Sequence, residues 1–385
     1  MAQVTALAGL ALIIFYCIRI VMYAVALRSA GKEVSGGQQQ AILAVSVVIP
    51  VRNEFGKLEN LERSLQQQDY PASQYEVIFV DDHSEDGSAE FLAQLAERNQ
   101  HYKLIRLDGK STGKKQAIHA GIQQAGGSWI IQSDADCTWP STFISGHARR
   151  AGEGDVQLIA GPVLNRNCSG LWCKLESLDV MSLTGTGMAS FLRGRPILCS
   201  GANLSYSKRL YAELSQELLK VPAASGDDIF LLLGARRSGA GTAYLASGQY
   251  VVETESTGGP RAFLQQRVRW GSKSKHYNHL DLISLTLLVW LTNLSLTVFL
   301  FGVFFNGLFL PLFIAAWLLK SLADFLLLSR TAGLLGRSSL LRWFPLAAIF
   351  YYFYVTLAGL FSLAGKYHWK QRGYGRGQVR QGAEM

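Results

Sequence analysis

The sequence of 385 residues is poor in the side chains that build structural metal sites. It has five cysteines and no C-x-x-C pair among them, so no zinc site is expected, and such cysteines suit a reducing compartment. His276 and His279 stand three apart, but next to an apolar run and a basic cluster we expect them at a membrane interface rather than on a metal. The cysteines are Cys17, Cys137, Cys168, Cys173 and Cys199.

Charge is nearly absent from two regions, residues 4–27 and most of 280–364, whereas the middle has the composition of a soluble protein. A membrane-spanning helix needs ~20 consecutive apolar residues. The pattern predicts one span at 4–27 and three candidates at about 280–304, 307–329 and 343–364. We therefore expect a membrane protein with a globular insert.

The first apolar run lacks the basic residue that precedes the core of a cleaved signal, although Ala24-Val25-Ala26 imitates a peptidase site. The run is also too long for a signal, so we interpret it as a retained anchor. Arg28 and Lys32 follow it directly, and the net charge of the chain is +9. By the positive-inside rule, the globular middle should lie in the cytoplasm.

The C-terminal spans do not give one consistent topology. Three full spans would place the basic tail, residues 366–385, on the side opposite the globular part, against the positive-inside rule. Lys320 and Asp324 interrupt the second candidate at an i, i+4 spacing that allows them to pair. One candidate could instead be re-entrant or interfacial, so the sequence predicts two or three C-terminal spans.

Apolar runs alternate with helical patterns in the soluble middle. Strands are expected at 44–50, 75–82, 102–107 and 129–136, and helices lie between them. Short buried strands that alternate with helices indicate a parallel α/β sheet covered on both faces. Ligands of such sheets bind beyond the carboxyl ends of the strands.

A P-loop is missing from the soluble part. The segment DGKSTGKKQA resembles one, but Gly109 and Gly113 enclose three residues rather than four, and Lys115 stands where Ser or Thr is needed after Lys114. Lys114 can still meet an anionic ligand at the start of a helix. A solvated surface lysine is the alternative.

Acidic residues gather at the predicted strand ends. Asp134 and Asp136 end the run WIIQSDAD, and in an extended chain both side chains would share a face. An ordinary polar turn is one explanation, and a bound Mg²⁺ or Mn²⁺ is the other. Because residues 50–54 and 81–84 are also polar and close two other strands, the ends should converge on one crevice, which favours a functional site.

Seven motifs occur in chain order between residues 45 and 275, and together they resemble the membrane-bound inverting family-2 glycosyltransferases. A basic tail with a tryptophan, HWKQRGY, is also typical of many members. The motifs are VVIPVRNE (47–54), VDDHSEDGS (80–88), GKKQAIHAG (113–121), SDAD (133–136), SGANLSY (200–206), GDDIFL (226–231) and QQRVRW (265–270).

The resemblance implies a GT-A type, Rossmann-like and mostly parallel sheet, a nucleotide-sugar donor (a UDP- or GDP-sugar), and Mg²⁺ or Mn²⁺ as cofactor. It implies that Asp228 is the general base and that Asp134 and Asp136, chiefly the second, hold the metal. Asp227 replaces the Glu that is more usual before the base, and His119 stands where Asn is common. The positions implied to bind substrate are Pro50, Arg52, Glu54, Asp81, Asp82, Lys114, Asp134, Asp227, Gln266, Arg269 and Trp270.

The chemistry of sugar transfer agrees with these residue types. A leaving nucleoside diphosphate needs charge neutralisation, and a carboxylate on the far side of the sugar can take the acceptor's proton. Gly-Asp-Asp before an apolar run is also a good helix cap, so we expect Asp227 to cap and Asp228 to face the cleft. Likewise, QQRVRW could be a basic helix on anionic lipid, with Arg267 and Lys273 facing lipid.

The sequence predicts an inverting enzyme that glycosylates a membrane-associated lipid or glycan acceptor, and no nucleic-acid partner. A processive polysaccharide synthase is the alternative within the family. A transporter or receptor that only binds nucleotides is the alternative outside it, and it would rely on ionisable residues within the spans. The predicted parts are an anchor (1–30), the GT-A domain (44–258), an amphipathic interfacial helix (259–279), C-terminal helices (280–365) and a basic tail (366–385).

Overall fold

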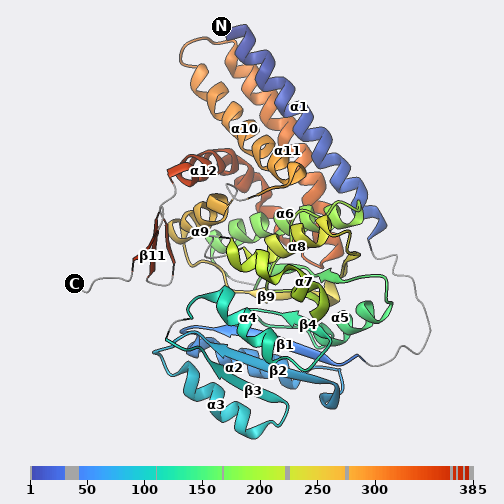
Figure 1. Ribbon diagram of the computed structural model, residues 1–385. Coiled ribbons are helices and arrows are strands. Elements are labelled where there is room, and N and C mark those ends of the chain that lie inside the picture. Colours follow the sequence, from blue (N-terminus) through green and yellow to red (C-terminus); the bar gives the residue numbers. More distant parts are fainter. Residues whose placement is uncertain are drawn as a thin grey trace.

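The computed structural model consists of a sheet domain beneath a group of long apolar helices (Figure 1). Lys32, Cys168 and His276, which were named above, lie outside the residues that the structure describes. The described residues are 2–30, 43–109, 111–166, 169–221, 226–273, 277–364, 367–369, 372–375 and 378–380.

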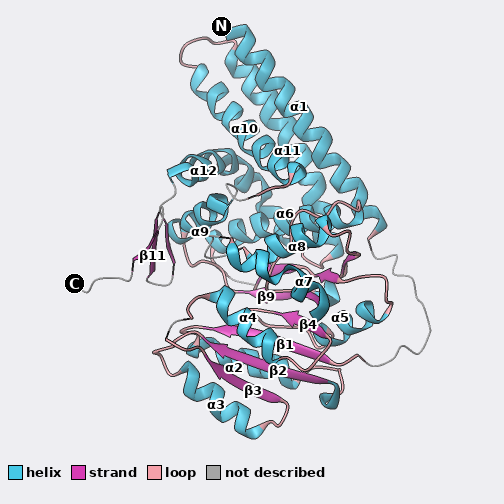
Figure 2. Ribbon diagram, viewed as in Figure 1, coloured by secondary structure: helices cyan, strands magenta, loops and turns pink. Residues whose placement is uncertain are grey.

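Helices form before, within and after the sheet domain (Figure 2). They are α1 (Ala2–Ala26), α2 (Phe55–Gln66), α3 (Ser88–Arg98), α4 (Lys114–Gln124), α5 (Phe143–Gly152), α6 (Leu171–Leu192), α7 (Lys208–Lys220), α8 (Asp227–Arg237), α9 (Pro260–Ser272), α10 (Leu280–Gly302), α11 (Phe309–Leu334) and α12 (Phe344–Ala364). A 3₁₀ segment, η5 (Ser338–Trp343), precedes α12.

The strands form one large sheet and two small ones. They are β1 (Val45–Val51), β2 (Tyr75–Asp81), β3 (Tyr102–Arg106), β4 (Trp129–Gln132), β5 (Leu158–Ala160), β6 (Val163–Asn165), β7 (Leu204–Ser207), β8 (Thr242–Tyr244), β9 (Val252–Thr254), β10 (Tyr367–Trp369), β11 (Arg372–Gly375) and β12 (Gln378–Arg380). The pair β6–β9 and the triplet β10–β11–β12 are the small sheets.

The large sheet has the order β3-β2-β1-β4-β7-β5-β8. Strands β1 to β4 run parallel, as the alternation of apolar runs and helices predicts, while β7 is antiparallel to both β4 and β5. The carboxyl ends of β1, β2 and β4 therefore lie at one edge. This mostly parallel α/β sheet is the predicted fold class.

Alternate residues of the central strands face opposite helical layers. Odd-numbered residues of β1, such as Val47 and Ile49, join a core with side chains of α2, α3 and α5. Val48 and residues of β2 join a second core with α4, α7 and α8. Both faces are covered, which explains why these strands are continuous apolar runs rather than alternating ones.

Helix α6 connects the sheet domain to the apolar helices. Its Met181 and Met188 are fully buried in a third core that includes residues of α1, α8, α10 and α11. A side chain at Gly185 would collide with Thr331 of α11, since a Cβ there would lie 2.1 Å from its Oγ1. Small residues allow this close approach of two helices.

Within the described residues, four helices, three of them on the C-terminal side, are long and apolar enough to cross a membrane. The predicted pairing of Lys320 with Asp324 is present at 2.5 Å, and Tyr16 of α1 donates to Asp324 at 2.6 Å. Helices α1, α10 and α11 pack on one another, whereas α12 packs on α10 and α9 and is inclined to the other three in Figure 1.

The prediction that the cysteines are reduced thiols holds for only some of them. Cys17, Cys137 and Cys199 are free thiols. Cys173 is disulfide-bonded, which the absence of a C-x-x-C pair did not anticipate.

Candidate active site

One large cavity, of about 680 Å³, lies where the sheet edge meets α6, α8, α9 and the start of α10. It brings together all but one of the residues that the resemblance implies to bind substrate or metal or to act as the base. Asp81 is the exception: its carboxylate accepts the N–H of Ser84, so it shapes the turn after β2. The cavity is lined by Pro50, Arg52, Glu54, Asp82, Lys114, Asp134, Asp136, Asp227, Asp228, Gln266, Arg269 and Trp270.

The ends of β1 and β2 are tied to each other and to α4. Asp82 Oδ2 accepts the N–H of Gly113 at 3.0 Å, and the Nη1 of Arg52 lies 3.6 Å from the same oxygen. Asn53 and His83 both adopt left-handed backbone conformations, with φ of 51° and 59°. Such conformations in non-glycine residues often occur at functional sites, because the surrounding structure must hold them.

Asp134 and Asp136 follow β4 in a turn, because β4 ends at Gln132 and the N–H of Cys137 bonds to the carbonyl of Asp134 at 3.3 Å. The predicted extended D-x-D is therefore wrong in its backbone geometry. Both side chains nevertheless line the cavity. Asp134 is ion-paired with Lys114, the first residue of α4.

Lys114 connects the two sets of acids electrostatically. Burial alone would lower its pKa, but Asp134, with smaller contributions from Asp228 and Asp227, raises it above the ordinary lysine value. Asp134 and Asp228 both act on the ammonium group of Lys114. The acids that follow β4 and those that begin α8 therefore lie close to the same lysine. Lys114 therefore places a positive charge beside Asp134 and near the acids of α8.

The environment of Asp136 is short of positive charge. Burial raises the pKa of this carboxyl group, and Asp134 and Glu54 raise it further, against the opposing effects of Lys57 and Lys114.

Across the described residues, no three His, Cys, Asp or Glu side chains cluster closely enough to hold a metal alone. One or two carboxylates in an open cavity fit Mg²⁺ or Mn²⁺, which take their remaining ligands from water and substrate phosphates.

The start of α8 contributes two further acids to the cavity wall, Asp227 and Asp228. Gly226 precedes the helix with a φ of 106°, so Asp227 lies in the first turn and not at the expected cap position. The Asp228 carboxylate accepts hydrogen bonds from the backbone N–H of Gly201 at 3.0 Å and from that of Ile229 at 2.8 Å. These two bonds hold the carboxylate in place. Burial raises the pKa of Asp227, with Lys115 acting against it.

One face of α9 forms another wall. Gln266, Arg269, Trp270 and Lys273 recur at helical spacing, and all four line the cavity. The expectation that Lys273 faces lipid is therefore wrong; burial lowers its pKa, against the effect of Asp228. The same expectation fails for Arg267, which is buried against α6.

No sequence motif indicated the uncharged wall of the cavity. A residue such as Leu183 gave no signal, because α6 is apolar on several sides and has no polar stripe to orient it. Glu176, also on α6, is buried and accepts both the N–H and the hydroxyl of Thr257. The uncharged lining includes Val180, Leu183, Thr184, Leu198, Tyr244, Tyr277, Leu282 and Thr286.

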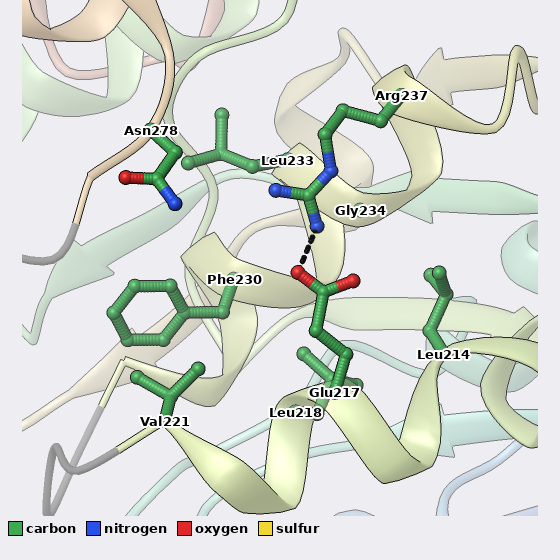
Figure 3. A pocket seen from close by; sticks show the side chains of 9 residues that line it. All are labelled: Leu214, Glu217, Leu218, Val221, Phe230, Leu233, Gly234, Arg237 and Asn278. Carbon is green, nitrogen blue, oxygen red and sulfur yellow. Dashed lines mark hydrogen bonds and ion pairs between the residues drawn. The ribbon is translucent and has the colours of Figure 1, made fainter.

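A second hollow, of about 50 Å³, lies between α7 and α8 (Figure 3). Figure 3 shows the ion pair between Arg237 and Glu217 across it, with Phe230 and Val221 on the apolar side. Pockets that hold small ligands have volumes of roughly 300–1,000 Å³. The second hollow is too small for a nucleotide.

Residues 46–215 match the model of the family described as glycosyl transferase family 2. An undecaprenyl-phosphate 4-deoxy-4-formamido-L-arabinose transferase of Photorhabdus laumondii is 40% identical over 116 residues, which cover 30% of this chain and 36% of that protein. Its namesake in Pectobacterium carotovorum is 36% identical over 152 residues, covering 38% and 46%. The matched regions thus span less than half the length of these relatives.

Among solved structures, a mannosyltransferase from Pyrobaculum calidifontis, in complex with GDP-Man and Mn²⁺, superposes with a TM-score of 0.55. The superposition covers 94% of this chain and 99% of that chain, at 16% sequence identity. At this identity the likeness is one of fold. It extends over the apolar helices as well as the sheet domain.

Proposed function

Since residues 46–215 of this chain belong to glycosyl transferase family 2, we propose that it transfers a sugar from a UDP- or GDP-sugar to a hydroxyl group of a membrane-associated acceptor, with inversion. The observation that carries this proposal is the single cavity that holds Asp136, Asp228 and the face of α9 with Gln266, Arg269 and Trp270. A sugar donor and an acceptor can both enter this cavity, where Arg269 supplies a cationic group and Asp228 an anionic one.

The polar end of the cavity suits the donor. Arg52, Glu54 and Asp82 at the ends of β1 and β2 offer a charged wall for the nucleoside, in the crevice where nucleotides bind to parallel sheets. Lys114 at the start of α4 and Arg269 from α9 offer positive charge to the diphosphate. These cations would stabilise the leaving group as its negative charge develops.

Asp136, with Asp134, would hold Mg²⁺ or Mn²⁺. The fit rests on the shortage of positive charge around Asp136 and on the position of both carboxylates in the cavity. When bound, such an ion neutralises charge on the diphosphate oxygens. Lys114 already pairs with Asp134, so Asp136 would be the principal ligand.

Asp228 would remove the proton from the acceptor hydroxyl. Two backbone N–H groups, those of Gly201 and Ile229, hold its carboxylate in place. In a single displacement the base lies on the far side of the sugar from the leaving group, and this geometry inverts the anomeric centre.

The acceptor would arrive from the membrane. The uncharged part of the cavity reaches Leu282 and Thr286, which lie in the first turns of α10, a helix able to cross a membrane. Tyr277 and Leu183 belong to the same uncharged lining, and Tyr277 lies near enough to Asp228 to feel its charge. A lipid with a polar head suits such a wall, and the two arabinose transferases bear the name of a lipid phosphate.

The helices favour a single transfer over extrusion of a polymer. Ile13, Leu296 and Phe299 are fully buried between α1, α10 and α11. Packed side chains therefore occupy the described part of this bundle, where a growing polysaccharide would need a passage. The buried Lys320 is paired with Asp324, which supports a structural role in the bundle and weakens the case for a transporter.

The sheet domain would face the cytoplasm. Arg28 closely follows α1, as the positive-inside rule requires for a cytoplasmic flank, and a nucleotide-sugar donor must be present on the side of the membrane that the sheet domain faces.

The proposal is tested by incubating the detergent-solubilised protein with a panel of nucleotide sugars, membrane lipids and Mn²⁺, and measuring released nucleoside diphosphate and glycosylated product. Asp228→Asn should reduce transfer by ~10²- to 10⁴-fold, the usual contribution of a general base. It should retain nucleotide binding, because the carboxylate does not contact the nucleoside in this proposal.

Asp136→Asn should instead abolish the dependence of the rate and of the melting temperature on Mn²⁺. Asp155→Asn, a change at an exposed acid outside the cavity, is the control and should behave as wild type. Transfer that persists unchanged in both Asp228→Asn and Asp136→Asn would refute the assignments.

A further inference from the structure

Arg267 lies inside the motif that gives α9 its cavity face, yet its own side chain is only 8% exposed. Its Nε donates to Asp179 Oδ2 on α6 at 2.8 Å, and its Nη2 donates to the same oxygen. Its Nη1 donates to the side-chain oxygen of Gln266. The guanidinium group thus binds one residue of the cavity wall and one residue of a neighbouring helix.

Two aromatic rings complete the surroundings of this guanidinium group. Its central carbon lies 4.3 Å from the ring centroid of Phe263 and 4.2 Å from that of Trp270. Cation–π contacts at these distances are favourable, and more so when desolvated. Arg267 therefore contacts both Gln266 and Trp270, the residues at either end of the Q-x-x-R-W motif.

Asp179 is itself held by a third helix. It is 7% exposed, and its Oδ1 accepts a hydrogen bond from the hydroxyl of Tyr354 on α12. Each oxygen of the carboxylate thus has a partner, one on α9 and one on α12. A buried ion pair is costly unless its geometry and remaining hydrogen bonds are satisfied, and here they are.

The donor chemistry of arginine orients the Gln266 amide. Because a guanidinium group only donates hydrogen bonds, the atom of Gln266 that it contacts must be the carbonyl oxygen. The amide nitrogen is then the end of Gln266 that can donate to an anionic ligand in the cavity. Without Arg267, this hydrogen bond would be lost, and it would no longer determine whether the amide oxygen or the amide nitrogen of Gln266 faces the ligand.

We propose that Arg267 is a positioning residue, which sets the Gln266 amide and the Trp270 ring against the donor diphosphate while Asp179 and Tyr354 fix Arg267. This proposal rests on the proposed transferase function, because it assumes that these cavity residues bind a nucleoside diphosphate. It also gives α12 a role in the site, through the Tyr354 hydroxyl.

The test compares four variants of the full-length protein for binding of UDP and GDP with Mn²⁺ by calorimetry, for kcat and donor KM, and for melting temperature. Arg267→Lys keeps the charge but loses the planar fork. The pair Arg267→Gln with Asp179→Asn removes both buried charges together, and Asp179→Asn alone leaves an unpaired cation. Arg261→Gln, at an exposed arginine of the same helix, is the matched control.

Arg267→Lys should lower kcat/KM by ~10²-fold, the cost of a small misplacement of groups around the reacting centre. The double variant should melt at a higher temperature than Asp179→Asn alone, but its kcat should be as low as that of Asp179→Asn. The control Arg261→Gln should match wild type. A double variant with wild-type kcat and KM would show that Arg267 only neutralises Asp179 and would overturn the proposal.

Nucleotide binding separates this proposal from the transferase function. If wild type binds UDP or GDP and Arg267→Lys binds more weakly, the positioning role stands even where no sugar is transferred. Wild-type binding by Arg267→Lys, with unchanged kinetics, would refute the positioning role while leaving the transferase proposal intact.

Discussion

His147 shows how single side chains stabilise the sheet domain. It is fully buried on α5, where its Nε2 lies 2.8 Å from Asn203 Oδ1 and its Nδ1 lies 2.8 Å from Ser205 Oγ. Asn203 Nδ2 donates to the carbonyls of Pro162 and Tyr250, so Asn203 Oδ1 must be an acceptor. His147 therefore carries its proton on Nε2 and accepts from Ser205 as a neutral ring.

This arrangement predicts acid sensitivity. Burial lowers the pKa of His147 to about 4. Because the unfolded chain binds the proton more readily, folded stability should fall as the pH drops from about 6.5 towards 4, by ~3 kcal/mol in total. Melting temperatures of wild type and His147→Gln, measured between pH 7.5 and 4.5, should show a steeper acid loss for wild type. Parallel curves would contradict this assignment.

The elements that the sequence predicted best are those with one clear periodicity. Strands β1, β2 and β3 begin and end within one residue of their predicted positions, because β1 and β2 are mainly apolar runs and all three are bounded by polar turns. The rule that ligands bind at carboxyl strand ends then placed Arg52, Asp82 and Asp136 correctly on one cavity.

The residues predicted poorly depend on partners distant in sequence. Arg267 was expected at lipid because a basic helix before a membrane span usually lies on headgroups, yet its partner Asp179 is 88 residues away. Lys273 was misplaced for the same reason, since the acids of α8 that attract it come from another part of the chain. No local pattern could have revealed either contact.

Both ends of α12 adjoin the side of the molecule that holds the sheet domain. Just before η5, Arg337 pairs with Glu253 of β9. Near the other end, Ser362 donates to the carbonyl of Val268 in α9 at 3.3 Å, and β10 lies beside α9 (Figure 1). A helix that starts and ends on one side of a bilayer does not cross it, so α12 fits the re-entrant or interfacial segment that the charge pattern allowed.

This arrangement predicts that the C-terminus and the sheet domain lie on the same side of the membrane. A protease-sensitive tag fused to the C-terminus should be protected in intact spheroplasts and cleaved after lysis. The same tag inserted between α10 and α11, after Asn306, should be cleaved in intact spheroplasts. Cleavage of the C-terminal tag from outside would show that α12 spans the membrane.

At the scale of the whole molecule, the site lies at the border between the sheet domain and the apolar helices. The sheet edge supplies Asp136, α8 supplies Asp228, and α9 supplies Arg269, while α6 and the start of α10 close the uncharged side. Helix α6 also packs in the core shared with α1 and α11, so the cavity and the membrane bundle form one continuous structure. Water-soluble donor and lipid acceptor would thus approach from different sides.

The most direct measurement is a structure determined by cryo-electron microscopy or crystallography with a nucleoside diphosphate and Mn²⁺, with anomalous scattering to locate the ion in a crystal. We predict Mn²⁺ on the Asp136 carboxylate and the diphosphate between Lys114 and Arg269, with Asp228 across the space left for the sugar. A nucleotide bound outside this cavity, or an ion away from Asp136, would contradict the account.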